Sequence, residues 1–437
     1  MGAREPVEEQ GGFRAALSLL GRNRDFRNLY LASLISLGGD WFLLVALFGL
    51  ALEITGSAIS VAFLIASQEI PFFLMSPLGG VLADRLDRRG LMVACDLARA
   101  MLVLGFLFVN DDGTLWIAYL LLALISSFAA VFDPASSAAL PNLVDERGLG
   151  PANALSGSLW GTMLAVGAAL GGIVAAAFGR DAAFLIDSAS FAISAVLLAR
   201  IRRPFSAERS EDVETNVIRA TVETVRYARR DHRVLALLTV KAGFGLAGGA
   251  IALLAVFALR EFDAGDVGIG VLMAGRGVGA LIGPFLGRWL AGPDDRRLFS
   301  AISIALVVFG LGYALLGVMP GLWLAAFAVG IGHLGGGAQW TLSSYGLQRV
   351  VPDRIRGRIF SFDFAMITLT FTVSALITGW AAERFGPRPT VVVLGGVAVL
   401  WALVWTWFTT DVRRATMLEG CGPAPELGPE LVGTQQA

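Results

Sequence analysis

Long apolar runs separated by short polar segments constrain the fold of this chain more than any other feature of its sequence. A helix needs about 20 predominantly apolar residues to cross the hydrocarbon core of a bilayer. The predicted spans are residues 29–52, 57–83, 90–109, 115–138, 153–177, 182–199, 234–258, 267–291, 298–318, 321–345, 359–382 and 389–409. Because backbone polar groups in lipid must be hydrogen-bonded within the protein, these runs predict an all-α membrane protein with about twelve transmembrane helices.

Composition supports this fold class and narrows the chemistry. Hydrophobic residues make up 56% of the 437 residues and charged residues 16%, against about 25% charged in soluble domains. The net charge of −1 indicates no nucleic-acid partner. The cysteines and histidines lack metal-ligand spacing, and the single lysine, Lys241, does not stand in a Gly-Lys-[Ser/Thr] phosphate loop. We therefore expect no metal, no cofactor, no ATP site and no enzyme activity.

The longest polar segment inside the chain, residues 200–233, divides the predicted spans into six plus six. This layout suggests an internal duplication with two parallel six-helix halves. Residues 217–228 fit either an amphipathic helix on the membrane surface or a solvated linker. The expected divisions are an N-terminal segment at 1–28, a first half at 29–199, the linker at 200–233, a second half at 234–410 and a disordered tail at 411–437.

The distribution of arginine predicts the orientation in the membrane. Most arginines stand in the polar segments on the same side as residues 85–89 and 200–233. The opposite loops hold only Arg180, Arg260, Arg384 and Arg388. Because positive charge accumulates on the cytoplasmic side, both termini are expected there, in a multi-pass protein of the inner (plasma) membrane. Residues 1–27 show no signal-peptide pattern.

Residues 79–89, which read GGVLADRLDRR, place dense charge between the second and third predicted spans. Gly79 and Gly80 would let the second helix approach a neighbour closely. Asp84 can accept hydrogen bonds at the N-terminus of another helix, where the dipole favours an anion. The arginines could anchor the loop to lipid headgroups, and anchoring alone would explain them but not Asp84.

This spacing resembles the loop signature of the major facilitator superfamily, although Asp87 stands where that family usually has glycine. The residues that carry the resemblance are Gly80, Asp84, Arg85, Arg88 and Arg89. In the family this loop contacts the eleventh span and latches the outward-facing state closed on the cytoplasmic side. The resemblance therefore implies a transporter that works by alternating access, with a gate at this loop.

Three further segments resemble the drug/macrolide and enterobactin exporter branch of the same superfamily. They are residues 132–144, 152–155 and 347–360, and the resemblance covers residues 20–412. In the fifth span, drug/proton antiporters of the superfamily often carry a Gly-Pro pair. This chain has Gly167-Ala168 there, so its glycines fit either an antiporter signature or close helix packing.

Ionisable side chains inside the spans are candidates for function, because each costs at least about 2.5–3.5 kcal/mol at the bilayer centre. The candidates for proton coupling or substrate binding are Asp40, Glu69, Arg99, Asp133, Asp187, Arg276 and His333. Asp40, which follows two glycines in mid-span, is the first candidate proton carrier and Glu69 is the second. Asp96 and Arg99 at i,i+3 could instead simply neutralise each other, and His333 could be a packing histidine.

Four of the ionisable residues lie nearer the expected cytoplasmic end, where gate pairs are expected: Asp96, Asp133, Lys241 and Asp363. Aromatic residues such as Trp41, Trp160 and Trp340 are candidates to line an apolar cavity. An apolar cavity with few charges suits a small amphipathic substrate, such as a drug or a secreted natural product.

The hypothesis is a monomeric exporter of small molecules that is driven by proton antiport. The alternatives are a siderophore exporter, an importer or uniporter on the same fold, and a membrane receptor or scaffold that transports nothing.

Overall fold

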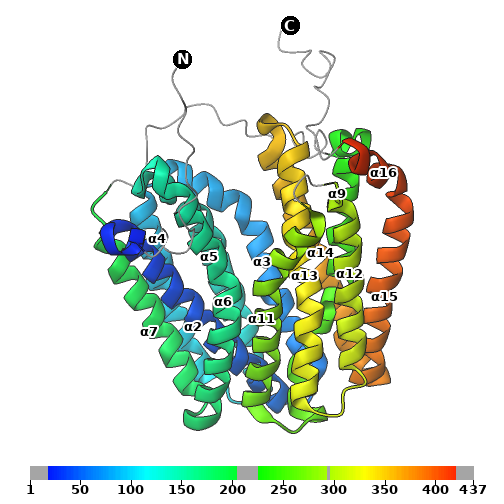
Figure 1. Ribbon diagram of the computed structural model, residues 1–437. Helices are drawn as coiled ribbons and strands as arrows, with labels where there is room; N and C mark the ends of the chain where they lie inside the picture. The colour runs from blue at the N-terminus through cyan, green and yellow to red at the C-terminus, as the bar shows by residue number, and fades with distance from the viewer. Residues whose placement is uncertain (1–17, 204–224, 293–295, 420–437) are drawn as a thin grey trace, which may run out of the picture. The chain divides into compact units, whose positions relative to one another are not determined.

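The computed structural model describes residues 18–203, 225–292 and 296–419 (Figure 1). Within these ranges every regular element is a helix, and eleven of the helical segments are long and apolar enough to cross a membrane. The all-α class is thereby confirmed. The predicted span at 321–345 corresponds to a helix of 29 residues, α13 (Leu322–Val350), which is not among the eleven. Its run of glycines, with His333 and Gln339, lowers its mean hydropathy.

The chain folds into two compact units. The first contains the described residues up to 203 together with Leu254–Gly277, and the second contains the remaining described residues. The helices that begin before residue 203 are α2 (Arg24–Thr55), α3 (Ala58–Arg85), α4 (Arg88–Val103), α5 (Leu115–Leu143), α6 (Glu146–Phe178) and α7 (Arg180–Ala199). The residue boundaries predicted for the two six-helix halves stay a prediction.

The later helices are α9 (His232–Gly248), α10 (Leu253–Val256), α11 (Gly265–Ala291), α12 (Leu298–Leu316), α13, α14 (Asp353–Phe385), α15 (Pro387–Phe408) and α16 (Thr410–Glu419). Short 3₁₀ and π turns join α9 and α10 into one apolar segment, His232–Glu261. In the second unit α12 packs against α13 and α15, and α9 packs against α14.

Local sequence sets where the helices begin and end. Asn23 caps α2, since its side-chain oxygen accepts from the backbone N–H of Phe26 at 3.0 Å. Gly56 ends α2 in the left-handed region, with φ 60°. In the same way Asp231 caps α9 by accepting from the N–H of Arg233 at 2.9 Å.

In the first unit α2 packs against both α6 and α7, and Figure 1 shows α2 (blue) running beside α7. Glycines permit the contact on both sides. A side chain at Gly171 of α6 would collide with the backbone of α2 at Phe42, and one at Gly39 of α2 would collide with Asp187 and Ser190 of α7. Gly171 of the fifth span therefore serves close packing, and the antiporter meaning of this span stays a prediction.

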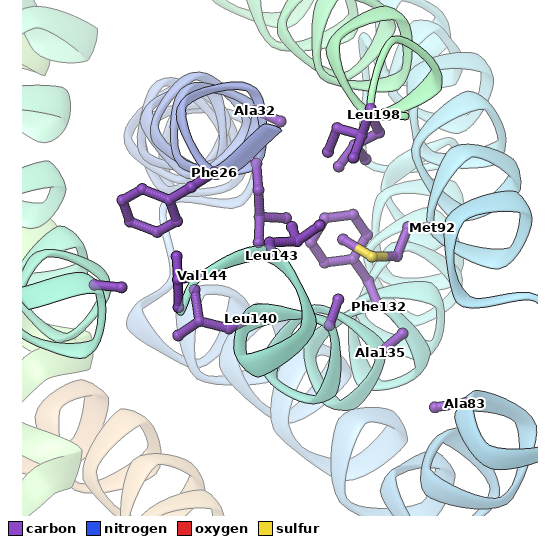
Figure 2. Packing of buried hydrophobic residues seen from close by; sticks show 14 of the residues in the cluster. Phe26, Ala32, Ala83, Met92, Phe132, Ala135, Leu140, Leu143, Val144 and Leu198 are labelled. Carbon is purple, nitrogen blue, oxygen red and sulfur yellow. The ribbon is translucent and has the colours of Figure 1, made fainter. Parts of the chain in front are cut away.

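An apolar cluster fills the end of this unit from which α2 starts. Figure 2 shows Phe132 of α5 beside Met92 of α4, with Leu143 and Leu198 close by. All four side chains are fully or almost fully buried. The cluster fixes the ends of α4, α5 and α7 that surround the charged residues described below.

Each unit contains the same glycine corner between two long helices. Gly179 joins α6 to α7 with φ 84° and ψ 161°, and Gly386 joins α14 to α15 with φ 89° and ψ 154°. A phenylalanine precedes the glycine in both places. Since L side chains rarely adopt positive φ, both corners require glycine. The shared corner is structural support for an internal duplication that the sequence analysis did not use.

Two expectations about polar segments need comment. Residues 411–419, which the sequence analysis placed in a disordered tail, are helical and belong to α16. The remainder of that tail lies outside the described residues. The predicted surface helix at 217–228 lies mostly outside them as well, and the described stretch from 225 to 230 is helical.

Candidate functional site

Four carboxylates and one arginine gather inside the first unit. Asp96 and Arg99 of α4 form a salt bridge and are both buried, as the i,i+3 spacing predicted. Ser194 of α7 donates its hydroxyl to Asp96 Oδ2 at 2.5 Å. The Arg99 guanidinium carbon lies 4.7 Å from the ring centre of Phe132 and 4.3 Å from that of Phe191. Two aromatic rings and one carboxylate thus hold this cation in place.

Asp187 of α7 lies on the side of the group nearest to α2. It is fully buried, and its Oδ1 accepts from the Ser190 hydroxyl at 3.3 Å. Among the described residues no hydrogen-bond donor contacts its Oδ2. Because Gly39 has no side chain, Asp187 and Ser190 fit directly against the backbone of α2. This places Asp187 beside the turn that carries the half-buried Asp40.

Asp40 and Asp133 complete the group. Asp40 is within electrostatic range of Arg99, and its carboxylate neighbours are Asp96, Asp133 and Asp187. Asp133 of α5 is solvent-exposed in the part of the chain that the structure describes. We name Asp40, Asp96, Asp133 and Asp187 the carboxylate cluster. The structure therefore brings together Asp40, Arg99, Asp133 and Asp187, four of the residues predicted from sequence.

The charges of this group do not balance. One guanidinium can neutralise one carboxylate, and Arg99 is already paired with Asp96. Ionised carboxylates in a low-dielectric interior are costly unless they are paired. The remaining members can reach neutrality by binding protons.

The sequence analysis missed Ser190, Ser194 and Phe191. A usable signal was present, because Asp187, Ser190 and Ser194 recur at three- and four-residue spacing in an apolar helix and so share one face. Polar residues on one face of a transmembrane helix point to a bundle interior.

Glu69 of α3 lies within electrostatic range of Arg276 of α11, and both residues belong to the first unit. The guanidinium of Arg276 also lies against the rings of Trp41 and Trp160. Glu69, the second candidate proton carrier, is therefore separate from the charges that surround Asp40.

His333 occupies an aromatic setting in the second unit. It is 3% exposed, and its Nδ1 lies 3.4 Å from the hydroxyl of Tyr313. The rings of Phe309 and Tyr313 meet the imidazole edge to face. A side chain at Gly279 would collide with its Cβ, so the histidine fills a tightly packed position. This geometry favours the packing role.

Residues 79–89 form the end of α3 and the start of α4. Gly79, not Gly80, provides the close helix contact: a side chain at Gly79 would collide with the carbonyl of Ala130, whereas one at Gly80 would meet nothing within 4 Å. Asp87 caps α4, since its Oδ2 accepts from the N–H of Gly90 at 2.7 Å. The residue that departs from the family pattern thus starts the next helix. The side chain of Asp84 lies outside the described residues, and its gating role stays a prediction.

The arginines of this loop bind helix ends rather than only projecting toward lipid headgroups. Arg88 donates to the carbonyls of Ala83 at 2.9 Å and Ala138 at 3.0 Å, and Arg89 donates to that of Ile201 at 2.8 Å. Ala83 lies in the last turn of α3, Ala138 lies inside α5 near its end, and Ile201 follows the end of α7. Arg85, by contrast, is exposed. Arg88 and Arg89 thus connect α4 with the ends of α3, α5 and α7.

At the other end of α2 three charged residues meet, a contact that the sequence analysis did not foresee. Arg180 of α7 binds Glu53 of α2, and its Nε and Nη2 donate to the two carboxylate oxygens of Asp266, each at 3.1 Å. Gly49 leaves the space that this pair occupies. Both partners of Arg180 stand in segments remote from it in sequence, so sequence alone offered no sign of the pairing.

Comparison with known proteins agrees with this architecture. A family model described as "Transmembrane secretion effector" (MFS_3) matches residues 16–419. An uncharacterized MFS-type transporter, YfiS, of Bacillus subtilis (strain 168) is 27% identical over 416 residues, which cover 88% of this chain and 93% of that protein. Macrolide efflux protein A of Streptococcus pyogenes is 25% identical over 388 residues, covering 87% and 94% respectively.

Among solved structures, a POT family transporter in complex with 5-aminolevulinic acid superposes with a TM-score of 0.74. The match covers 90% of this chain and 97% of that one at 10% sequence identity, so it shows the fold alone. The multi-pass helical architecture, the match along nearly the whole chain and the transporter relatives identify a membrane transporter rather than an enzyme. The chain belongs to the transmembrane secretion effector family of the major facilitator superfamily.

Proposed function

We propose that this protein exports small amphipathic molecules across the cell membrane in exchange for protons, by alternating access, as a monomer with both termini in the cytoplasm. The observation that carries the proposal is the carboxylate cluster, which places four acids around the single guanidinium of Arg99.

Proton exchange follows from the imbalance of this cluster. Asp187 is buried with one oxygen that has no donor among the described residues, and Asp40 lies beside it on α2. A carboxyl group in such a place is stable when protonated and costly when ionised. A conformational change that alters its access to water would therefore take up a proton on one side of the membrane and release it on the other.

The outward direction and the substrate class are supported by likeness rather than by geometry. The family description names secretion, and one relative that matches along most of the chain is named as a macrolide efflux protein. An amphipathic substrate suits the aromatic side chains of the first unit, such as Trp41 and Trp160. Among the described residues no group of three or more His, Cys, Asp or Glu side chains could hold a metal ion.

Export of radiolabelled erythromycin from preloaded cells tests the proposal. Cells that produce the protein should lose the label faster than cells without it, and a protonophore should abolish the difference. Asp40→Asn should lower the export rate by at least about tenfold, because a neutral amide cannot carry the proton. Asp181→Asn is a matched control, since Asp181 is an exposed acid of α7 outside the cluster.

Three outcomes of this export assay would each contradict one part of the proposal. Export that survives the protonophore would contradict proton coupling. Net uptake of label by the producing cells would contradict the outward direction. An Asp40→Asn protein that exports at the wild-type rate would remove Asp40 from the mechanism.

A further inference from the structure

Arg276 lies against two tryptophans in the first unit, away from the carboxylate cluster. Its guanidinium carbon is 6.0 Å from the ring centre of Trp41 and 5.5 Å from that of Trp160. The two indoles meet edge to face, with their ring centres 6.3 Å apart and their planes at 70°. A cation at these distances is attracted to both ring faces. Three helices, α2, α6 and α11, each supply one of the three side chains.

The indole N–H of Trp41 is a second, independent sign of a ligand. The Trp41 side chain is 7% exposed, and no acceptor among the described residues contacts its Nε1. Buried indole N–H groups usually find a hydrogen-bond partner, because leaving a donor unpaired costs free energy. A ligand oxygen at this position would satisfy the donor, and the positive charge of Arg276 would attract the same oxygen.

The structure also indicates how such a ligand would reach the site. Trp160 is 46% exposed, and Arg276 is partly exposed beside it. A guanidinium inside a transmembrane span faces the bundle interior or a water-filled path rather than lipid, since exposure to lipid is costly. The exposed part of the Trp160 ring lies beside Arg276, so it offers a stacking surface to a solute that reaches the guanidinium.

The backbone holds these groups in a fixed arrangement. A side chain at Gly167 would press against Trp41, and one at Gly277 would collide with the backbone of Ala165. Glycine at these positions brings α6 close to both α2 and α11. The two indoles and the guanidinium are therefore positioned before any ligand arrives, which lowers the entropic cost of binding.

We propose that Trp41, Trp160 and Arg276 form a substrate site for planar apolar molecules that carry an anionic oxygen, such as an aromatic carboxylate. The inference rests on the proposed export function, because it assigns the substrate class to the same transporter. Glu69 lies within electrostatic range of Arg276, so a ligand carboxylate that binds the guanidinium would lie within range of Glu69 as well. Trp41 donates to the carboxylate, and Trp160 stacks on the ring system.

Equilibrium dialysis with the purified full-length protein in lipid nanodiscs tests the site directly. The probes are radiolabelled 2-naphthoate and 2-naphthylmethylammonium, which share a ring system and differ in charge. The wild type should bind the carboxylate at least about tenfold more tightly, as expected for a charge-assisted hydrogen bond. Arg276→Gln should abolish the preference, whereas Arg276→Lys should retain part of it. Trp41→Phe, which keeps a ring but removes the donor, should weaken 2-naphthoate binding about threefold to tenfold.

Arg288→Gln is the matched control. Arg288 stands on the same helix, and its guanidinium carbon lies 5.2 Å from the ring centre of Tyr345, so the substitution removes an equivalent cation–π contact elsewhere. It should leave both affinities unchanged. Retention of the carboxylate preference by Arg276→Lys shows that the loss in Arg276→Gln is due to charge rather than misfolding.

The site is ruled out if the wild type binds both probes equally, or if Arg276→Gln keeps the wild-type preference. These outcomes are independent of the transport test, because dialysis is performed without a proton gradient. Protonophore-sensitive export of erythromycin without binding of 2-naphthoate would refute this site alone. Binding of 2-naphthoate without protonophore-sensitive export of either erythromycin or 2-naphthoate would refute the proposed function and leave the site intact.

Discussion

Buried charge is arranged differently in the two units. In the first unit four carboxylates share one guanidinium. In the second unit Lys241 and Asp363 form a one-to-one salt bridge. Lys241 is 2% exposed, donates to the Ser344 hydroxyl at 2.9 Å and lies 4.7 Å from the ring centre of Trp340. An excess of acid favours proton exchange, whereas a balanced pair favours a fixed structure.

This difference suggests that the salt bridge has a structural role and the carboxylate cluster exchanges protons, which fits the proposed proton antiport. Lys241 and Asp363 were predicted as gate residues, and the structure brings them together across 122 residues of sequence. Their charges are equal in number, and both side chains are buried. The carboxylate cluster, by contrast, cannot satisfy all its members in the ionised form.

The largest expected effect comes from breaking the balanced pair. Lys241→Met should lower the free energy of unfolding by about 3–5 kcal/mol, because it leaves Asp363 buried without its cation. The double variant Lys241→Met with Asp363→Leu should recover most of that loss, since it removes both charges. Thermal unfolding of the purified protein in detergent measures both. A single variant as stable as the wild type would mean that the pair is not the rigid element described here.

A smaller loss is expected where the carboxylate cluster meets α2. Gly39→Ala should destabilise the protein by about 1–3 kcal/mol, because the new methyl group overlaps Asp187 and Ser190. Gly80→Ala is the matched control, since nothing lies within 4 Å of a side chain there. That control should leave stability unchanged or raise it by up to about 1 kcal/mol through helix propensity. Equal melting temperatures for the two variants would contradict the close contact at Gly39.

The smallest effect on stability should come from neutralising an acid of the cluster. Asp187→Asn should change the free energy of unfolding by less than about 1 kcal/mol, because an amide resembles a protonated carboxyl in size and charge. Erythromycin export should nevertheless fall by about tenfold if Asp187 takes part in proton exchange. A large loss of stability instead would indicate that Asp187 is ionised in the resting protein, and the contrast between the two units would then weaken.

The positions of the helices could be predicted from the sequence, but the contacts between their side chains could not. Span positions follow from hydropathy, which is a local property, and even the glycine-rich α13 falls where a span was predicted. The acids at 40 and 187 were recognised one by one, but their meeting depends on how α2 packs on α7. Likewise the arginines at 88 and 89 were expected at lipid headgroups, since the carbonyls that they bind belong to segments remote in sequence and come within reach only once the helices have packed.

One turn of α2 carries a residue of the proposed proton site and a residue of the proposed substrate site. Asp40 belongs to the carboxylate cluster, and its neighbour Trp41 lies against Arg276 about 100° further around the helix. If a proton and a substrate both bind through this turn, thermodynamic linkage makes their influence reciprocal. Whatever factor a bound proton imposes on substrate affinity, bound substrate must impose on proton affinity. The strength of coupling between proton and substrate in the proposed antiport would then depend on a free energy that arises within four residues, from Gly38 to Trp41.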